Sequence, residues 1–295
     1  MVPPSVIDGG NSVLVGVFVN FARERQSMDD ATGKLDPSPL LQFTDFLEGC
    51  SGRTKWASVN AVGHIQKAID IAVIDPAMAA FRAVCAEEEA ATALLSSLKE
   101  QEYPGADKLW FRNHADKHAV VLFVGTIMQW FKNRKKQAGE QFGRHRIFFD
   151  DVDGRIGLRL GIQLGQTDTE IQPTPPLHVR AEGPKTLGEH FQEEMKELLG
   201  FEKTSEIRGL IDKRANFRNT ILYATPAGIP KPTGDVCAFI NNQIGIVNSL
   251  LIALALIDPW QAPNHPKSEI VTVSIGVFVD LMDRVKKEAA ESPKV

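Results

Sequence analysis

Two imidazole groups, a lysine and an arginine gather in the segment Arg112-Asn113-His114-Ala-Asp-Lys117-His118. An imidazole can take up or release a proton near neutral pH, and two histidines one helical turn apart can hold a metal ion. His114 and His118 have that spacing, but no acidic helper of the His-Glu-x-x-His type accompanies them. We therefore expect no metal site, and we expect His114 to pair with a carboxylate on a neighbouring helix.

Glu88 is the candidate for that carboxylate, because it falls on a helix face that is otherwise apolar. We expect Glu87 and Glu89, its neighbours in the chain, to point away from the centre of this face. A buried carboxylate must be paired, hydrogen-bonded or protonated. The alternative is a solvated face on a less buried helix. The residues that share the face at spacings of three and four are Phe81, Val84, Glu88, Ala91, Leu95 and Leu98.

Arg214 and Arg218 lie one turn apart on a third helix, at positions that otherwise carry isoleucines such as Ile211 and Ile221. A guanidinium group does not lose its charge, so each arginine needs an acceptor. That acceptor is a buried carboxylate such as Glu88, a run of helix carbonyls, or a phosphate of a ligand. These two arginines and the following Asn219 are therefore candidates for binding an anion.

The chain resembles the helical proteins of the higher eukaryote and prokaryote nucleotide-binding (HEPN) class, and more narrowly their phage abortive-infection branch. The residues that carry the resemblance are Ala86-Glu-Glu-Glu89 on one helix and Phe111-Arg-Asn-His-Ala-Asp-Lys-His118 on the next. It covers about residues 76–135. The chain differs from the compact bundles of that class in two respects. A β segment follows the matching residues, and a further helical region follows the β segment.

Ribonucleases of the HEPN class carry an arginine, a polar neighbour and a histidine a few residues later, which Arg112, Asn113 and His118 match. The resemblance implies cleavage of RNA without metal or cofactor. His118 would move a proton to or from the ribose 2′-hydroxyl or the leaving oxygen, and Arg112 would stabilise charge on the phosphoryl oxygens. Glu88 would support them, with His114 and Lys117 nearby.

The site could instead be built from the third helix, because Arg214-x-x-x-Arg218-Asn219 resembles an Arg-Asn element of related helical families. In the first assembly, Arg112 and His118 at the start of their helix are the exposed chemical groups. Glu88, Arg214 and Arg218 are then partners within the bundle. Whether the two groups form one site is a question for the structure.

These residues are positioned by a mainly α fold, a helical bundle with a small antiparallel β insertion. We divide the chain into a helical region at 1–145, a hairpin or three-stranded insertion at 146–183 and a second helical region at 184–295 that packs with the first. Asp75 is expected to cap a helix that begins at Pro76, and the next helix is expected from about Lys108 to Lys132. Strict alternation of aliphatic residues from Ile156 to Leu164, just after the turn signal Asp153-Gly154, predicts the hairpin, and Leu177 to Ala181 predict a third strand.

Composition excludes several function classes. The formal net charge of -4 argues against a protein that coats nucleic acid, although the basic run from Lys132 to Arg146 is either a phosphate-binding surface or a solvated one. The three cysteines are far apart and fit a reducing cytoplasm. The start, Met-Val-Pro-Pro, has no basic region typical of a signal peptide. The apolar window Ile244 to Ile257 is expected to be a buried core helix, too short to cross a membrane.

From these features and the resemblance we expect either an RNA-binding protein or an endoribonuclease that cleaves RNA without metal. We expect it to belong to a phage-defence or toxin-type system and to act as a cytoplasmic homodimer. One alternative is a non-catalytic helical scaffold, whose buried charges specify how the helices align. Another is a sensor of an anionic small molecule that binds at Arg214 and Arg218.

Overall fold

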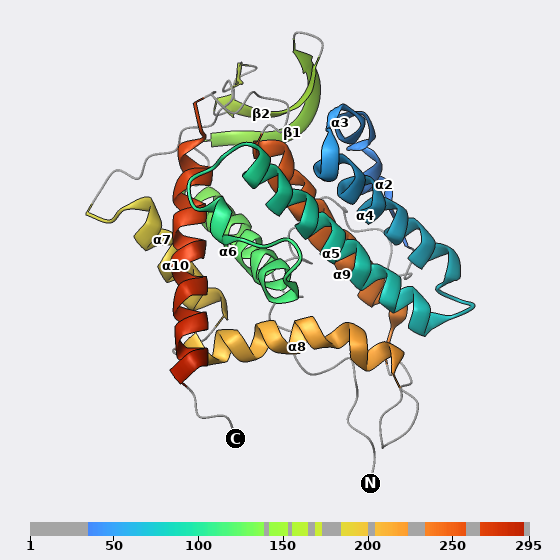
Figure 1. Cartoon of the computed structure of the whole chain (residues 1–295). Coiled ribbons are helices and arrows are strands. Elements are labelled where there is room, and N and C mark those ends of the chain that lie inside the picture. The colour runs from blue at the N-terminus through green and yellow to red at the C-terminus, as the bar shows by residue number, and fades with distance from the viewer. Residues whose placement is uncertain are drawn as a thin grey trace.

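The protein is mainly α-helical with a small antiparallel sheet, as the sequence predicts (Figure 1). The computed structural model describes residues 35–138, 142–152, 155–164, 169–172, 184–199, 204–223, 234–257 and 266–291. The helices are α2 (Ser38–Leu41), α3 (Thr44–Gly49), α4 (Gly52–Ile71), α5 (Pro76–Glu100), α6 (His114–Ala138), α7 (Leu187–Leu199), α8 (Thr204–Leu222), α9 (Val236–Ile257) and α10 (Glu269–Glu291), with a 3-10 turn, η1 (Ala106–Lys108).

The start of α5 agrees with the predicted cap. The carboxylate of Asp75 accepts a hydrogen bond from the backbone N–H of Met78 at 3.0 Å, and Pro76 occupies the first turn. After α5 ends at Glu100, the chain turns at Gly105, whose φ of 84° lies in the left-handed region that glycine adopts without strain. The cap and the turn set the length of α5, the helix that carries Glu87 and Glu88.

Helix α6 begins six residues later than expected, at His114 and not at Lys108. Asn113 explains this start, because its side-chain oxygen accepts the backbone N–H of Ala115 at 2.9 Å, as a helix cap does. Trp110 lies on the turn before α6 and is exposed. Arg112 and Asn113 are therefore outside the helix.

The three strands are β1 (Phe142–Val152), β2 (Arg155–Leu164) and β3 (Glu170–Ile171), in the order β1-β2-β3. β1 and β2 pair antiparallel from Val152 opposite Arg155, on either side of Asp153-Gly154, which confirms the predicted hairpin. The insertion begins at Phe142, slightly before the predicted boundary. The third strand is Glu170–Ile171, and the predicted strand at Leu177 to Ala181 lies outside the described residues.

Helix α9 forms the centre of the core, as expected for the apolar window that it contains. By length and composition it is the one described helix that could cross a membrane, with a mean hydropathy of 1.7 over a window that is 78% buried inside the protein. The expectation that this segment is too short was wrong, because the helix extends back to Val236. Its burial confirms the core-helix prediction.

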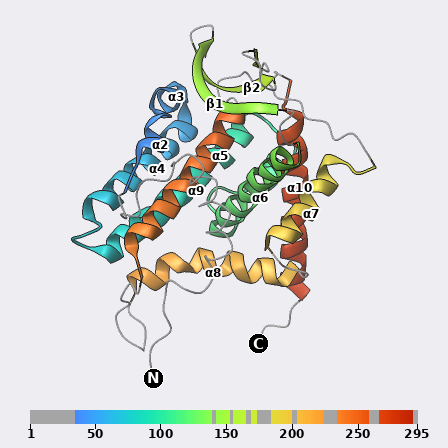
Figure 2. The same ribbon diagram turned by 180° about the vertical axis from the view of Figure 1, so that it is seen from behind.

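The two helical regions pack together around α5. Helices α4 and α9 lie alongside α5, and α8 crosses beneath α5 and α6 at the end of the molecule opposite the sheet (Figures 1 and 2). Alanines on α4 and α5 allow these two helices to approach closely; the fully buried ones are Ala61, Ala68, Ala79, Ala83, Ala86, Ala90, Ala91 and Ala93. Most of the surface of α5 is therefore covered by other helices.

Replacing the cap of α5 tests this account of where the helix starts. We expect Asp75→Ala to lower the free energy of unfolding by about 1 kcal/mol, because the N–H of Met78 loses its acceptor. Urea denaturation monitored by circular dichroism measures the change. Asp70→Ala, an exposed position near the end of α4, is the control and should change stability by less than about 0.5 kcal/mol. Equal effects of the two variants would contradict a capping role.

Candidate functional site

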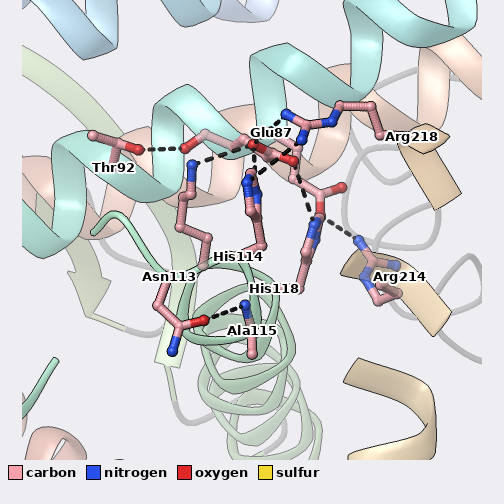
Figure 3. Close-up of polar contacts among 10 residues, drawn as sticks. Glu87, Thr92, Asn113, His114, Ala115, His118, Arg214 and Arg218 are labelled. Carbon is pink, nitrogen blue, oxygen red and sulfur yellow. Dashed lines mark hydrogen bonds and ion pairs between the residues drawn. The ribbon is translucent and has the colours of Figure 1, made fainter. Parts of the chain in front are cut away.

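The successive helices α5 and α6 and the distant helix α8 bring ionisable side chains to one place (Figure 3). The histidines of α6 point toward carboxylates on α5, and two arginines reach in from α8 (Figure 3). We call this group the charged cluster; its members are Glu87, Glu88, His114, Lys117, His118, Arg214 and Arg218.

Glu87 is the most buried carboxylate of the charged cluster, so the expectation that it points away from the core was wrong. Only 1% of its surface is exposed. Its Oε1 accepts a hydrogen bond from Arg214 Nη2 at 2.6 Å and lies 3.0 Å from His118 Nδ1. The prediction failed because α5 is buried around most of its circumference, and not on one face only. Two consecutive residues therefore both point into the protein.

Glu88 is also buried and paired, which confirms the prediction made for it. Its Oε2 lies 3.1 Å from His114 Nδ1 and 3.2 Å from Lys117 Nζ. Arg218 Nη1 approaches the same oxygen at 3.5 Å. The other oxygen, Oε1, is 3.7 Å from His118 Nε2, a distance that fits an ion pair better than a hydrogen bond. Glu88 therefore contacts residues of both α6 and α8.

His118 lies between the two carboxylates and is only 2% exposed, so the expectation that it is open to solvent was wrong. Four residues after the first residue of α6, it falls on the helix face that turns inward. Arg112 is exposed on the turn before α6, where its guanidinium lies 5.8 Å from the ring of Phe111. The described contacts thus do not join Arg112, Asn113 and His118 into one exposed site.

The pKa values of both carboxylates are held well below their ordinary range. Burial alone would raise the pKa of Glu87, but the charge of Arg214 and the contacts with His118 lower it to about 2. Burial likewise opposes the shift at Glu88, where His118, Lys117 and His114 lower the pKa to about 2. Both carboxylates are therefore ionised at neutral pH.

The two histidines shift in opposite directions. Burial favours neutral His118, but its contacts with Glu87 and Glu88 outweigh burial and raise its pKa. The pKa of His114 is lowered by partial burial and by the charges of Lys117 and Arg218, against the opposing effect of Glu88. His118 is thus favoured as an imidazolium, while His114 is favoured as a neutral imidazole.

Positive charge exceeds negative charge in the cluster. Lys117, Arg214 and Arg218 face two carboxylates, and protonated His118 adds to the excess. A buried excess of one sign is unfavourable unless a counter-charge is supplied. Part of the surplus lies at the open edge, because Lys117 and Arg218 there face a single carboxylate, Glu88. An anion bound at that edge would balance the cluster.

His114 and Arg218 form that open edge, with 41% and 29% of their side chains exposed. Arg218 Nη2 lies 3.5 Å from His114 Nε2. A guanidinium can only donate, so the lone pair of this imidazole is on Nε2 and its hydrogen is on Nδ1, which faces Glu88. The edge therefore presents a proton acceptor beside a cation, on a ring oriented by a buried carboxylate.

The remaining predicted residues lie around this edge. Asn219 is exposed on α8, and its backbone carbonyl accepts a hydrogen bond from the Tyr223 N–H. Among the described residues, no three His, Cys, Asp or Glu side chains are grouped so as to hold a metal ion. The side chains of the basic run after Lys132 largely lie outside the described residues. Sequence reasoning missed Glu87, although it stands beside Glu88 in an acidic run.

Replacement of Glu87 tests the inner contact. We expect Glu87→Gln to lower the free energy of unfolding by about 3 kcal/mol, because Arg214 and protonated His118 lose the charge that compensates their burial. Chemical denaturation at neutral pH measures this change. Glu89→Gln removes a neighbouring carboxylate from the same helix and should have a much smaller effect. Similar losses in both variants would show that Glu87 is not a buried counter-ion.

The shifted pKa values predict how stability depends on pH. Glu87 and Glu88 stabilise the fold above about pH 4.5, and this contribution is lost as the pH falls toward 2. His118, whose pKa is raised, stabilises the fold below about pH 6.5 and ceases to do so as the pH rises through its raised value. His114 has a lowered pKa and acts with the opposite sign.

Urea denaturation across pH therefore compares the wild type with His118→Gln and His114→Gln. The stability advantage of the wild type over His118→Gln should shrink as the pH rises above 6.5. Its advantage over His114→Gln should not shrink in that range. A constant difference between wild type and His118→Gln at every pH would contradict a raised pKa for His118.

Comparisons with known proteins found no match from which a function could be inferred. No family model matches the chain, and no curated protein or solved structure matches it. The geometry and charge of the charged cluster are therefore the basis for the function proposed below.

Proposed function

We propose that this protein binds RNA at the open edge of the charged cluster and cleaves it without a metal ion. The observation that carries the proposal is the pairing of His114 and Arg218. A half-exposed imidazole, held by a buried carboxylate and favoured in its neutral form, stands 3.5 Å from a partly exposed guanidinium. The resemblance of the two helices to HEPN proteins supports RNA as the anion.

The chemistry of such an edge is transfer of a phosphoryl group within the RNA strand. The phosphate of the bound strand takes the Arg218 N–H in place of His114 Nε2, which frees the lone pair of Nε2. His114 Nε2 then takes the proton from a ribose 2′-hydroxyl, and the freed oxygen attacks the adjacent phosphorus. The bond from phosphorus to the 5′ oxygen breaks, and that oxygen takes up a proton from solvent. The products are a 2′,3′-cyclic phosphate and a 5′-hydroxyl. Arg218 and Lys117 stabilise the charge that builds up on the phosphoryl oxygens.

This assignment keeps the reaction class inferred from the sequence and changes the residues. Arg112 and His118 were the predicted catalytic pair, and Asn113 their polar neighbour. In the proposed site, Arg218 and His114 take those roles. His118 acts as a positioning residue, because its ring contacts both carboxylates and so sets where Glu88 meets His114. Asn113 positions the start of α6 by capping it.

A non-catalytic scaffold is the second candidate, and the buried half of the cluster favours it. Glu87, His118 and Arg214 are sealed in the interior, where ion pairs can specify how helices align without any chemistry. A sensor of a small anion would use the same open edge. The homodimer, the cytoplasmic location and the role in phage defence stay predictions.

Incubation with labelled RNA oligonucleotides in the presence of EDTA tests cleavage. We expect fragments that end in a cyclic phosphate, and we expect His114→Ala to lower the cleavage rate by about 100-fold or more, because the proton acceptor is lost. His190→Ala on α7 is the control and should cleave as the wild type does. A DNA oligonucleotide of the same sequence should stay intact, because it has no 2′-hydroxyl.

Two outcomes would contradict the proposed reaction. One is cleavage that EDTA abolishes, and the other is equal cleavage by the wild type and His114→Ala. RNA that is bound but left intact would also reject cleavage, while leaving the binding half of the proposal in place. A scaffold would instead show neither binding nor cleavage, with variants of the open edge close to the wild type in both assays.

A further inference from the structure

Arg82 of α5 and His64 of α4 form a second basic site outside the charged cluster. Arg82 Nη1 lies 3.4 Å from His64 Nδ1, and both side chains are partly buried. Since the guanidinium can only donate, His64 accepts on Nδ1 and carries its hydrogen on Nε2. Lys67 is exposed one turn along α4. Burial, then Arg82 and then Lys67 lower the pKa of His64, which favours its neutral form.

Among the described residues Arg82 contacts no carboxylate, which sets it apart from Arg214 and Arg218. A guanidinium has five N–H donors, and a neutral imidazole accepts from only one of them. The remaining donors of a partly buried arginine are best matched by an acceptor that carries charge and has several oxygens. A phosphate is such an acceptor, because arginine binds it in a bidentate manner.

Cys85 shows that this second site is continuous with the charged cluster. Burial raises the pKa of the Cys85 thiol to about 11; Glu88 adds to the shift, and Arg218 and Arg82 both act against it. The thiol therefore lies close enough to Arg82 and Arg218 to be affected by both charges. Arg82, Cys85 and Glu89 are three and four residues apart and all partly exposed, so they lie along one strip of α5, beside the buried Glu88.

The strip has a length suited to more than one phosphate. With a rise of 1.5 Å per residue, Arg82 and Glu88 are about 9 Å apart along the axis of α5. Glu88 is matched by Lys117 and His118 of the charged cluster, which leaves Glu89 as the other carboxylate here. Arg82, Lys67 and Arg218 outnumber Glu89. The balance is therefore positive, with Arg82 and Lys67 toward one end of the strip and Arg218 near the other.

We propose that Arg82, His64 and Lys67 bind a second phosphate of the RNA strand whose scissile phosphate lies at His114 and Arg218. The strand then runs along α5, from the edge between α6 and α8 toward α4. This inference rests on the proposed function and deepens it, because it assigns the ligand as an oligonucleotide and not a mononucleotide. His64 donates from Nε2, Arg82 provides the charge, and Lys67 adds an exposed ammonium.

Binding of a non-cleavable oligonucleotide tests the second site without relying on catalysis. A fluorescent RNA with 2′-O-methyl groups is titrated with full-length protein at several salt concentrations, and fluorescence anisotropy gives the affinity. We expect Arg82→Gln to weaken binding several-fold and to reduce the slope of log affinity against log salt by about 0.7, the value for one lost phosphate contact on a single strand.

Arg208→Gln is the matched control, because Arg208 is a partly exposed arginine that pairs with Asp212 on α8. The inference is overturned if Arg82→Gln and Arg208→Gln bind the oligonucleotide alike. Thermal unfolding checks that the variants fold. If Arg82→Gln does not, Lys67→Gln at the exposed end of the same site replaces it, and an unchanged salt slope in that variant overturns the inference.

The two proposals fail in different ways. Binding that depends on Arg82, without cleavage of unmodified RNA, rejects the reaction and keeps the second site. Cleavage that depends on His114, with no effect of Arg82→Gln, rejects the second site and keeps the reaction. Wild-type protein that binds no oligonucleotide rejects both.

Discussion

The contact of Glu87 with Arg214 and His118 is the interaction on which the rest of the site depends. It takes a carboxylate out of water and balances it with one residue from α6 and one from α8. Because a buried charge without a partner is strongly unfavourable, these three helices can pack in few other ways. Glu88 is then left to contact the residues of the open edge, where solvent is within reach.

The helices and the hairpin followed from local patterns, whereas the site did not. Asp75 and Pro76 marked the start of α5, and the alternation around Asp153-Gly154 marked the hairpin, because both signals depend on neighbouring residues. Burial of Glu87 depends on α6 and α8 arriving from other parts of the chain. The sequence pattern of α5 alone does not show which helices pack against it, so Glu87 was predicted to point away from the core.

The misplacement of His118 has a similar cause. Its spacing from Arg112 fits a motif, but the motif does not say where the helix begins. Once Asn113 caps α6, Arg112 lies on a turn and His118 falls one turn inside the helix, facing α5. The pairing of Glu88 with His114 was predictable, since an ionisable group on an apolar face must have a partner. Which histidine beside Glu88 stays exposed, His114 or His118, depends on the tertiary structure.

The distance in sequence between the partners also bears on how the chain folds. Glu87 and Arg214 are 127 residues apart, so a ribosome has made α5, α6 and the sheet before the arginine exists. Until then, Glu87 has His118 but not Arg214, and α8 and α9 do not yet cover α5. The packing of the first helical region is therefore completed only after α8 and α9 are made, late in translation.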